Sequence, residues 1–244
     1  MLSEINKLIF KALGLVSEDK NQQAQEIVES ILNNKQYLNK LDAYDWQYIA
    51  HISLAIGKFL QAQDAYKKAN NFPGVAFILI LLGKLDEAKN ILMNTNQSPA
   101  TIWCNFLIDL FSEKKIKSYP SFLFIRHFLE FTVYYLLLAK KVNYIELIFK
   151  NLNKLSDMNL DSEKLIGYAY FHYGEVDEAI KILNSSIEKN QFDGEVYFIL
   201  GQAYLMRGAP FEALAMLENA QLLLPHHVPT KELLEETRAK VLNV

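Results

Sequence analysis

The chain has 244 residues, of which 51% are hydrophobic and 22% charged, and its net charge is −3. This composition excludes an intrinsically disordered chain, and the weak charge excludes binding of nucleic acid through a strongly basic surface. Cys104 is the single cysteine, so an internal disulfide and a thiolate zinc site are excluded as well. Glycine (9) and proline (6) are scarce, which favours long helices over a fold with many turns.

The first predicted elements are two amphipathic helices, at 2–13 and 20–32. Their apolar residues recur at spacings of three and four, as Ile5 and Ile9 do in the first helix. The N-terminus has an early acidic residue and lacks the basic start and apolar stretch of a secretory signal peptide. We therefore expect an N-terminal helix pair at 1–42 and, with the single cysteine, a reducing cytoplasmic location.

Glycines recur at regular places further along the chain. Four of them each end an apolar helical run and stand five residues before an alanine. These pairs are Gly57 and Ala62, Gly83 and Ala88, Gly174 and Ala179, and Gly208 and Ala213. A tight turn between helices needs a residue that tolerates positive φ, and an alanine lets the second helix approach the first. The spacing predicts two repeats at 43–99, the second of them shortened, and two more at 160–225.

The two repeats at 160–225 match each other most closely. Gly167, Tyr170 and Gly174 recur 34 positions later as Gly201, Tyr204 and Gly208. Gly167 and Gly201 fall inside first helices, where glycine costs roughly 1 kcal/mol relative to alanine, so we expect a neighbouring helix to pack onto each. A period of 34 with small residues at fixed phases resembles the tetratricopeptide repeat (TPR), a helix-turn-helix unit that stacks into a solenoid.

The resemblance implies an all-α fold, a right-handed superhelical solenoid of about seven antiparallel helix pairs. We expect one TPR-like solenoid over residues 1–244. Residues 100–158 contain no glycine anchors and are expected to form an irregular helical insert. Residues 226–244 are polar along one face and are expected to form a C-terminal capping helix.

The most apolar window, residues 122–139, is the one candidate for a membrane span. Arg126, His127 and Glu130 interrupt it, and each of them would be costly inside a bilayer. We therefore expect a buried helix and no membrane insertion.

Residues that could carry catalysis or bind a metal are few and scattered. His226 and His227 are adjacent, and no third ligand lies nearby in the sequence. The pairs Asp86–Glu87 and Asp177–Glu178 each open a predicted helix, where negative charge stabilises free N–H groups. Because no phosphate-binding loop, dinucleotide motif or zinc spacing occurs, we expect no catalytic residue, no metal, no cofactor and no enzyme activity.

In tetratricopeptide proteins the first helices line a groove, so the resemblance implies candidate binding residues. They are His51, Phe77, Lys164, Tyr168, Phe171, His172, Phe198, Gln202 and Leu205. The family's best-known ligand mode clamps a C-terminal carboxylate with lysine, asparagine and arginine, and here only Lys164 matches. The remaining surface is aromatic and aliphatic, which suits an apolar peptide or a partner helix. The same side chains could instead pack on one another as core.

The sequence therefore predicts a cytoplasmic, non-catalytic adaptor that binds a peptide segment or helix of another protein. One alternative is a chaperone similar to the class II chaperones of type III secretion. The other is a structural subunit of a larger complex, which would form an oligomer through residues 100–158.

Overall fold

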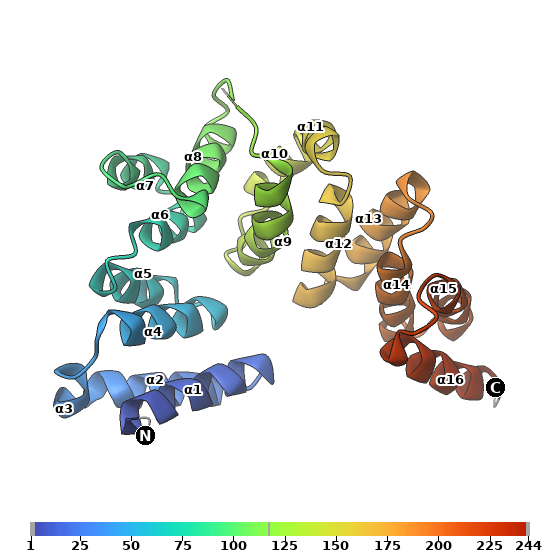
Figure 1. Cartoon of the computed structure of the whole chain (residues 1–244), viewed down its shortest axis with the longest axis horizontal. Helices are drawn as coiled ribbons and strands as arrows, with labels where there is room; N and C mark the ends of the chain where they lie inside the picture. Colours follow the sequence, from blue (N-terminus) through green and yellow to red (C-terminus); the bar gives the residue numbers. More distant parts are fainter. Residues whose placement is uncertain (1–2, 117, 243–244) are drawn as a thin grey trace. The chain divides into compact units, whose positions relative to one another are not determined.

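The computed structural model describes residues 3–116 and 118–242, and their regular structure is helical throughout (Figure 1). The expected all-α class is therefore confirmed. The helices group into two compact units, residues 1–118 and residues 119–244. None of the described helices is both long and apolar enough to span a bilayer.

Unit 1 contains three helix hairpins, formed by α1 with α2, α4 with α5, and α6 with α7. Helix α8 packs against both α6 and α7, and α3 is a single short helix. The bounds are α1 (Glu4–Ser17), α2 (Asn21–Asn33), α3 (Lys35–Leu38), α4 (Ala43–Ala55), α5 (Phe59–Lys68), α6 (Phe72–Leu81), α7 (Leu85–Leu92) and α8 (Pro99–Phe111).

Unit 2 also contains three hairpins, formed by α9 with α10, α12 with α13, and α14 with α15. Helix α12 packs against α9, α13 against α14 and α15 against α16, so each hairpin covers the apolar side of the next. The bounds are α9 (Phe122–Leu138), α10 (Val142–Lys150), α11 (Leu152–Met158), α12 (Ser162–Tyr173), α13 (Val176–Lys189), α14 (Gly194–Met206), α15 (Pro210–Leu223) and α16 (Val228–Leu242).

The described chain thus holds six hairpins and four further helices, close to the expected seven pairs. The boundary between the units falls inside the segment 100–158, which was expected to be irregular. Within that segment, α9 and α10 form a hairpin like the others, although the sequence there lacks a glycine anchor.

The six hairpin turns share one backbone geometry, in which a residue with positive φ follows the first helix. Gly57, Gly83, Gly174 and Gly208 hold this position, with φ of 76°, 83°, 95° and 78°. Asp19 and Lys140 hold it in the α1–α2 and α9–α10 turns, with φ of 56° and 55°. In the α9–α10 turn the Lys141 N–H donates to the Leu136 carbonyl at 2.9 Å, as the Glu175 N–H donates to the Tyr170 carbonyl at 3.0 Å after α12.

We expect Lys140→Gly to raise the free energy of unfolding by about 0.5–1 kcal/mol, because a side chain in the left-handed region is strained and glycine is not. Urea denaturation of the purified chain measures the change. Gly174→Ala, the reverse change at the matching turn, should lower the unfolding free energy by about 1 kcal/mol or more. If Lys140→Gly instead lowers the unfolding free energy, the Lys140 side chain stabilises the turn by more than the strain of its positive φ costs.

Small residues set the distance between the two helices of a hairpin. A Cβ added at Gly167 would lie 2.5 Å from Leu183 Cδ2 on α13, and one added at Gly201 would lie 2.6 Å from Leu217 Cγ on α15. The alanines in the second helices, Ala62, Ala88, Ala179 and Ala213, are all fully buried. Glycine on one helix and alanine on the other therefore let each pair approach closely.

Candidate functional site

The first helices of unit 2 expose a continuous series of side chains, which we call the first-helix face. On α12, Lys164, Tyr168 and His172 follow one another at four-residue spacing and stay at least partly exposed, while Ile166 and Ala169 are buried. The face also includes Phe171 on α12, Glu130 and Phe131 on α9, and Glu195, Phe198, Gln202 and Leu205 on α14. The structure thus brings seven of the nine predicted binding residues together on neighbouring helices of one unit.

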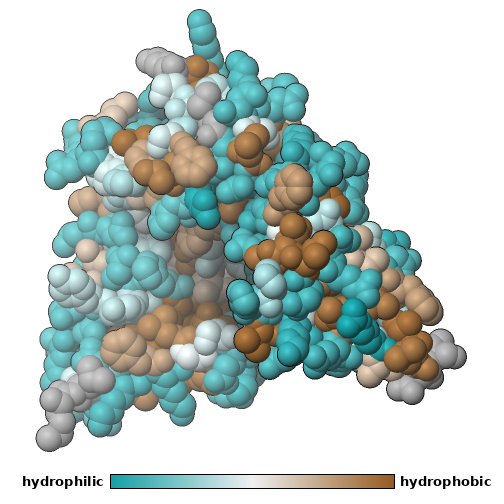
Figure 2. All heavy atoms as spheres, turned by 45° about the vertical axis from the view of Figure 1, so that its right-hand side comes forward, coloured by the Kyte–Doolittle hydropathy of each residue, from teal (hydrophilic) through white to brown (hydrophobic). Residues whose placement is uncertain are grey.

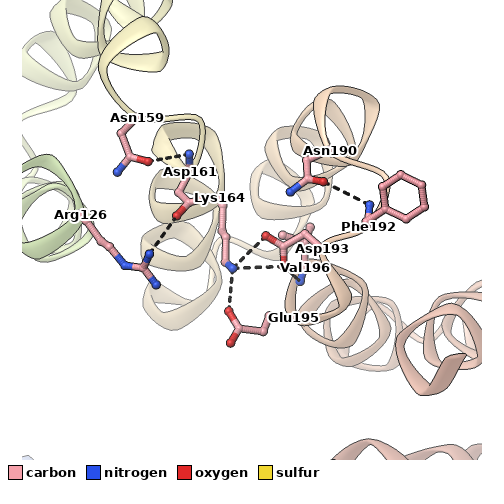
Figure 3. A network of polar contacts seen from close by, with 9 residues as sticks. All are labelled: Arg126, Asn159, Asp161, Lys164, Asn190, Phe192, Asp193, Glu195 and Val196. Atoms are coloured by element: carbon pink, nitrogen blue, oxygen red, sulfur yellow. Dashed lines mark hydrogen bonds and ion pairs between the residues drawn. The ribbon is translucent and has the colours of Figure 1, made fainter. Parts of the chain in front are cut away.

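A polar network joins α12 to α14 across this face (Figure 3). Lys164 Nζ donates to Asp193 at 3.1 Å (Oδ1) and 2.9 Å (Oδ2), and to Glu195 Oε2 at 2.6 Å. The side chains of Lys164 and Asp193 are only 12% and 14% exposed. Burial alone lowers the pKa of Lys164, but hydrogen bonds and charge from Glu195 and Asp193 outweigh it, and the pKa is raised overall.

Lys164 is therefore already neutralised by two carboxylates, which leaves it unavailable to clamp the C-terminal carboxylate of a ligand. Arg126 on α9 forms a longer and more exposed ion pair, in which its Nη1 lies 3.6 Å from Asp161 Oδ2 and its side chain is 61% exposed. The face carries these two cations against four carboxylates, those of Glu130, Asp161, Asp193 and Glu195.

Tyr168 lies between these charges, and its buried hydroxyl has no hydrogen-bond partner among the described residues. Its pKa is raised well above the usual value, first by burial and then by the negative charge of nearby carboxylates, Asp193 foremost. Nearby negative charge therefore adds to burial in keeping the Tyr168 hydroxyl protonated.

Aromatic rings form the apolar part of the face. Phe198 packs edge-on against His227, with ring centroids 5.1 Å apart, and Phe171 lies 5.5 Å from the ring of His172. The ammonium of Lys164 lies 5.7 Å from the centre of the Tyr168 ring. On the side of the molecule drawn in Figure 2, hydrophilic side chains predominate and apolar ones form separate patches.

The two remaining predicted residues, His51 and Phe77, lie in unit 1. Phe77 is only 7% exposed, because α6 is buried from Val75 to Leu81. The burial of Phe77 favours the core alternative for this residue, since an all-apolar helix has no polar side that identifies which residues face solvent.

His51 lies on α4, with its ring packed against that of Tyr66 at 5.7 Å between centroids, and it belongs to a hydrogen-bonded chain. Asn71 Nδ2 donates to Gln47 Oε1 at 2.9 Å, which directs the Gln47 amide nitrogen towards His51 Nε2, also at 2.9 Å. The Gln47 amide can donate only to an unprotonated Nε2, so this contact requires a neutral histidine. Burial also lowers the pKa of His51.

Because the folded pKa of His51 is lowered, its stabilising contribution should be complete above pH 6.5 and lost as the pH falls through the folded pKa. We expect the parent chain to lose more unfolding free energy between pH 7.5 and pH 5.5 than the His51→Gln variant. Urea denaturation at both pH values measures this difference. Equal losses in the two proteins would show that the protonation of His51 is not coupled to folding.

Unit 1 carries an exposed aromatic cluster that was not predicted from the sequence. Tyr44 and Tyr48 lie on the same side of α4 as His51, and Phe10 on α1 lies 5.7 Å from Tyr48 between ring centroids. The spacing of residues 44, 48 and 51 could have predicted this cluster, because residues at i, i+4 and i+7 lie on one side of a helix.

The acidic pairs and the cysteine, which were considered as possible catalytic or metal-binding groups, occupy structural positions among the described residues. Asp86 and Glu87 lie in the first turn of α7, and Asp177 and Glu178 in that of α13, as expected of residues that stabilise helix N-termini. Burial raises the pKa of the Cys104 thiol to about 12. No three metal-binding side chains come together among residues 3–116 and 118–242.

These hairpins, with their shared turn geometry and close glycine contacts, define a helical-repeat protein with a TPR-like fold. No protein-family model matches the sequence, and no curated protein is similar enough in sequence to count as a relative.

Solved structures with a similar arrangement include three TPR proteins. The TPR domain of P58(IPK) is 15% identical, the match covers 98% of this chain and 66% of that one, and the TM-score is 0.41. A TPR protein from Parabacteroides merdae is 16% identical. The match covers 96% of this chain and 98% of that one, and the TM-score is 0.41. YrrB, described as a TPR protein with an unusual peptide-binding site, is 16% identical. The match covers 84% of this chain and 95% of that one, and the TM-score is 0.34.

Proposed function

We propose that the chain is a non-catalytic protein-interaction module, and that the first-helix face of unit 2 binds an apolar or amphipathic segment of another protein. One observation carries the proposal: Tyr168, Phe171, Phe198 and Leu205 stay partly exposed on adjacent helices. Tyr168 and Phe171 also pack against the buried cluster beneath them, which holds their rings in place. Aromatic side chains placed in this way are the usual anchors of protein interfaces. The proposed location is the cytoplasm.

Fixed charge at one end of this surface supports an orienting role. Lys164, Asp193 and Glu195 are held to one another and need no ligand to stay in place. A segment bound across the aromatic residues would meet preformed polar groups, which reduces the entropy lost on binding.

The test is selection from a displayed random peptide library with the purified chain, followed by affinity measurement for the selected peptides. Tyr168→Ala and Phe198→Ala should each weaken binding by about tenfold or more, as truncation of an interface anchor does. Phe211→Ala is the matched control, because Phe211 is exposed on the second helix α15.

The thermal stability of each variant is measured separately, and affinity is compared where all variants are folded. Unchanged affinity in both variants, or equal loss in Phe211→Ala, would show that these rings form core and not a binding surface. The oligomeric state of the purified chain separates the alternatives: a chaperone without its client should aggregate, and a structural subunit should form a defined oligomer.

A further inference from the structure

A pocket of about 320 Å³ opens between α9 and α12 in unit 2. Its walls include the rings of Phe131, Tyr134 and Tyr135 from α9, and His172 from α12 borders it. Phe131 and Tyr135 lie edge-to-face with ring centroids 4.5 Å apart. The pocket therefore combines aromatic rings with the charged or titratable side chains of Arg126, His127, Glu130 and His172.

Glu130 is the acidic group of this pocket, and its side chain is 37% exposed. His172 is its ion-pair partner: the His172 Nε2 lies 3.9 Å from Glu130 Oε1, and the imidazole is charged only when protonated. Burial raises the pKa of Glu130, and His172 opposes that rise. The carboxylate is thus partly desolvated, and among the described residues no lysine or arginine forms an ion pair with it.

The nearby cations pair with other carboxylates. Arg126 lines the pocket, but its guanidinium lies 3.6 Å from Asp161, and Lys164 pairs with Asp193 and Glu195. A carboxylate beside aromatic rings, in a region where carboxylates outnumber cations, is complementary to an organic cation.

We propose that this pocket receives a basic side chain, lysine or arginine, of the partner polypeptide. The proposal rests on the proposed function and specifies the chemistry of its ligand. The cation would form a charge-assisted hydrogen bond with Glu130 while its alkyl stem and charge lie against Phe131 and Tyr134. The apolar residues of the same segment would lie along Tyr168 and Phe198.

The experiment uses peptides selected from the random library, each remade with its basic residue replaced by norleucine. On the parent chain we expect this replacement to weaken binding by about tenfold, the effect of losing one such contact. On Glu130→Gln the replacement should have little effect, because the contact is already lost. Glu146→Gln is the control: it removes the same charge from the exposed side of α10, and it should behave as the parent does.

The outcomes separate this inference from the proposed function. If peptides bind but carry no preferred basic residue, or if norleucine weakens binding equally in Glu130→Gln and the parent, the pocket assignment is overturned and the binding face stands. If the purified chain selects no peptide, the proposed function fails and the pocket assignment fails with it.

Discussion

Lys164→Met should lower the free energy of unfolding by about 2 kcal/mol, because it leaves Asp193 partly buried without its counter-charge. Loss of one partner from a fully buried pair costs about 3–5 kcal/mol, and the exposure of Glu195 to solvent reduces that figure here. Methionine keeps the length and apolar stem of the lysine, so packing changes little. Urea denaturation at neutral pH measures the loss.

The matched control adds Asp193→Asn to Lys164→Met. Asp193 also caps α14 by accepting from the Val196 N–H at 3.3 Å, and asparagine keeps that capping group while removing the charge. The double variant should recover much of the stability. Because the pKa of Lys164 is raised overall, the gap between parent and single variant should disappear as the pH rises through the folded pKa. A single variant as stable as the parent would show that the network is solvated and contributes nothing.

Gly201→Ala should lower the unfolding free energy by about 1–3 kcal/mol, because the new methyl group would overlap Leu217 and force α14 and α15 apart. Alanine normally stabilises a helix relative to glycine. A decrease in the unfolding free energy would therefore report the overlap with Leu217 and not helix propensity. Thermal or urea denaturation provides the measurement.

Gly14→Ala is the control for this substitution. Gly14 is also inside a helix, α1, and a Cβ there would meet no atom within 4 Å. It should raise the unfolding free energy by up to about 1 kcal/mol through helix propensity. If Gly201→Ala also proves stabilising, the two helices are further apart than the glycine contact implies.

A glycine in the turn marked four of the six hairpins in the sequence, and the α1–α2 pair was expected from helical spacing alone. Asp19 and Lys140 adopt the same left-handed geometry without glycine, so the hairpins α1–α2 and α9–α10 carried no such signal. Ala24 does stand five residues after Asp19, but Ile145 holds that position after Lys140, which removes the second marker as well. Part of the apparent irregularity at 100–158 therefore arises because one repeat, α9–α10, has lysine at the usual turn glycine and isoleucine at the usual alanine.

The partly exposed residues of α12 were predicted from the positions that they hold in a tetratricopeptide repeat. The partners of Lys164 could not be predicted, since Asp193 and Glu195 lie 29 and 31 residues away and their contact depends on how α14 packs on α12. The Glu130 pocket was hidden for a related reason: it combines residues of two helices whose adjacency no motif encodes.

Asp193 holds two positions at once, as the N-terminal cap of α14 and as the counter-ion of Lys164 on α12. The first turn of one repeat therefore cannot fray without releasing a charge on the repeat before it. We expect the amides of α12 and α14 to exchange with deuterium as a single cooperative opening unit.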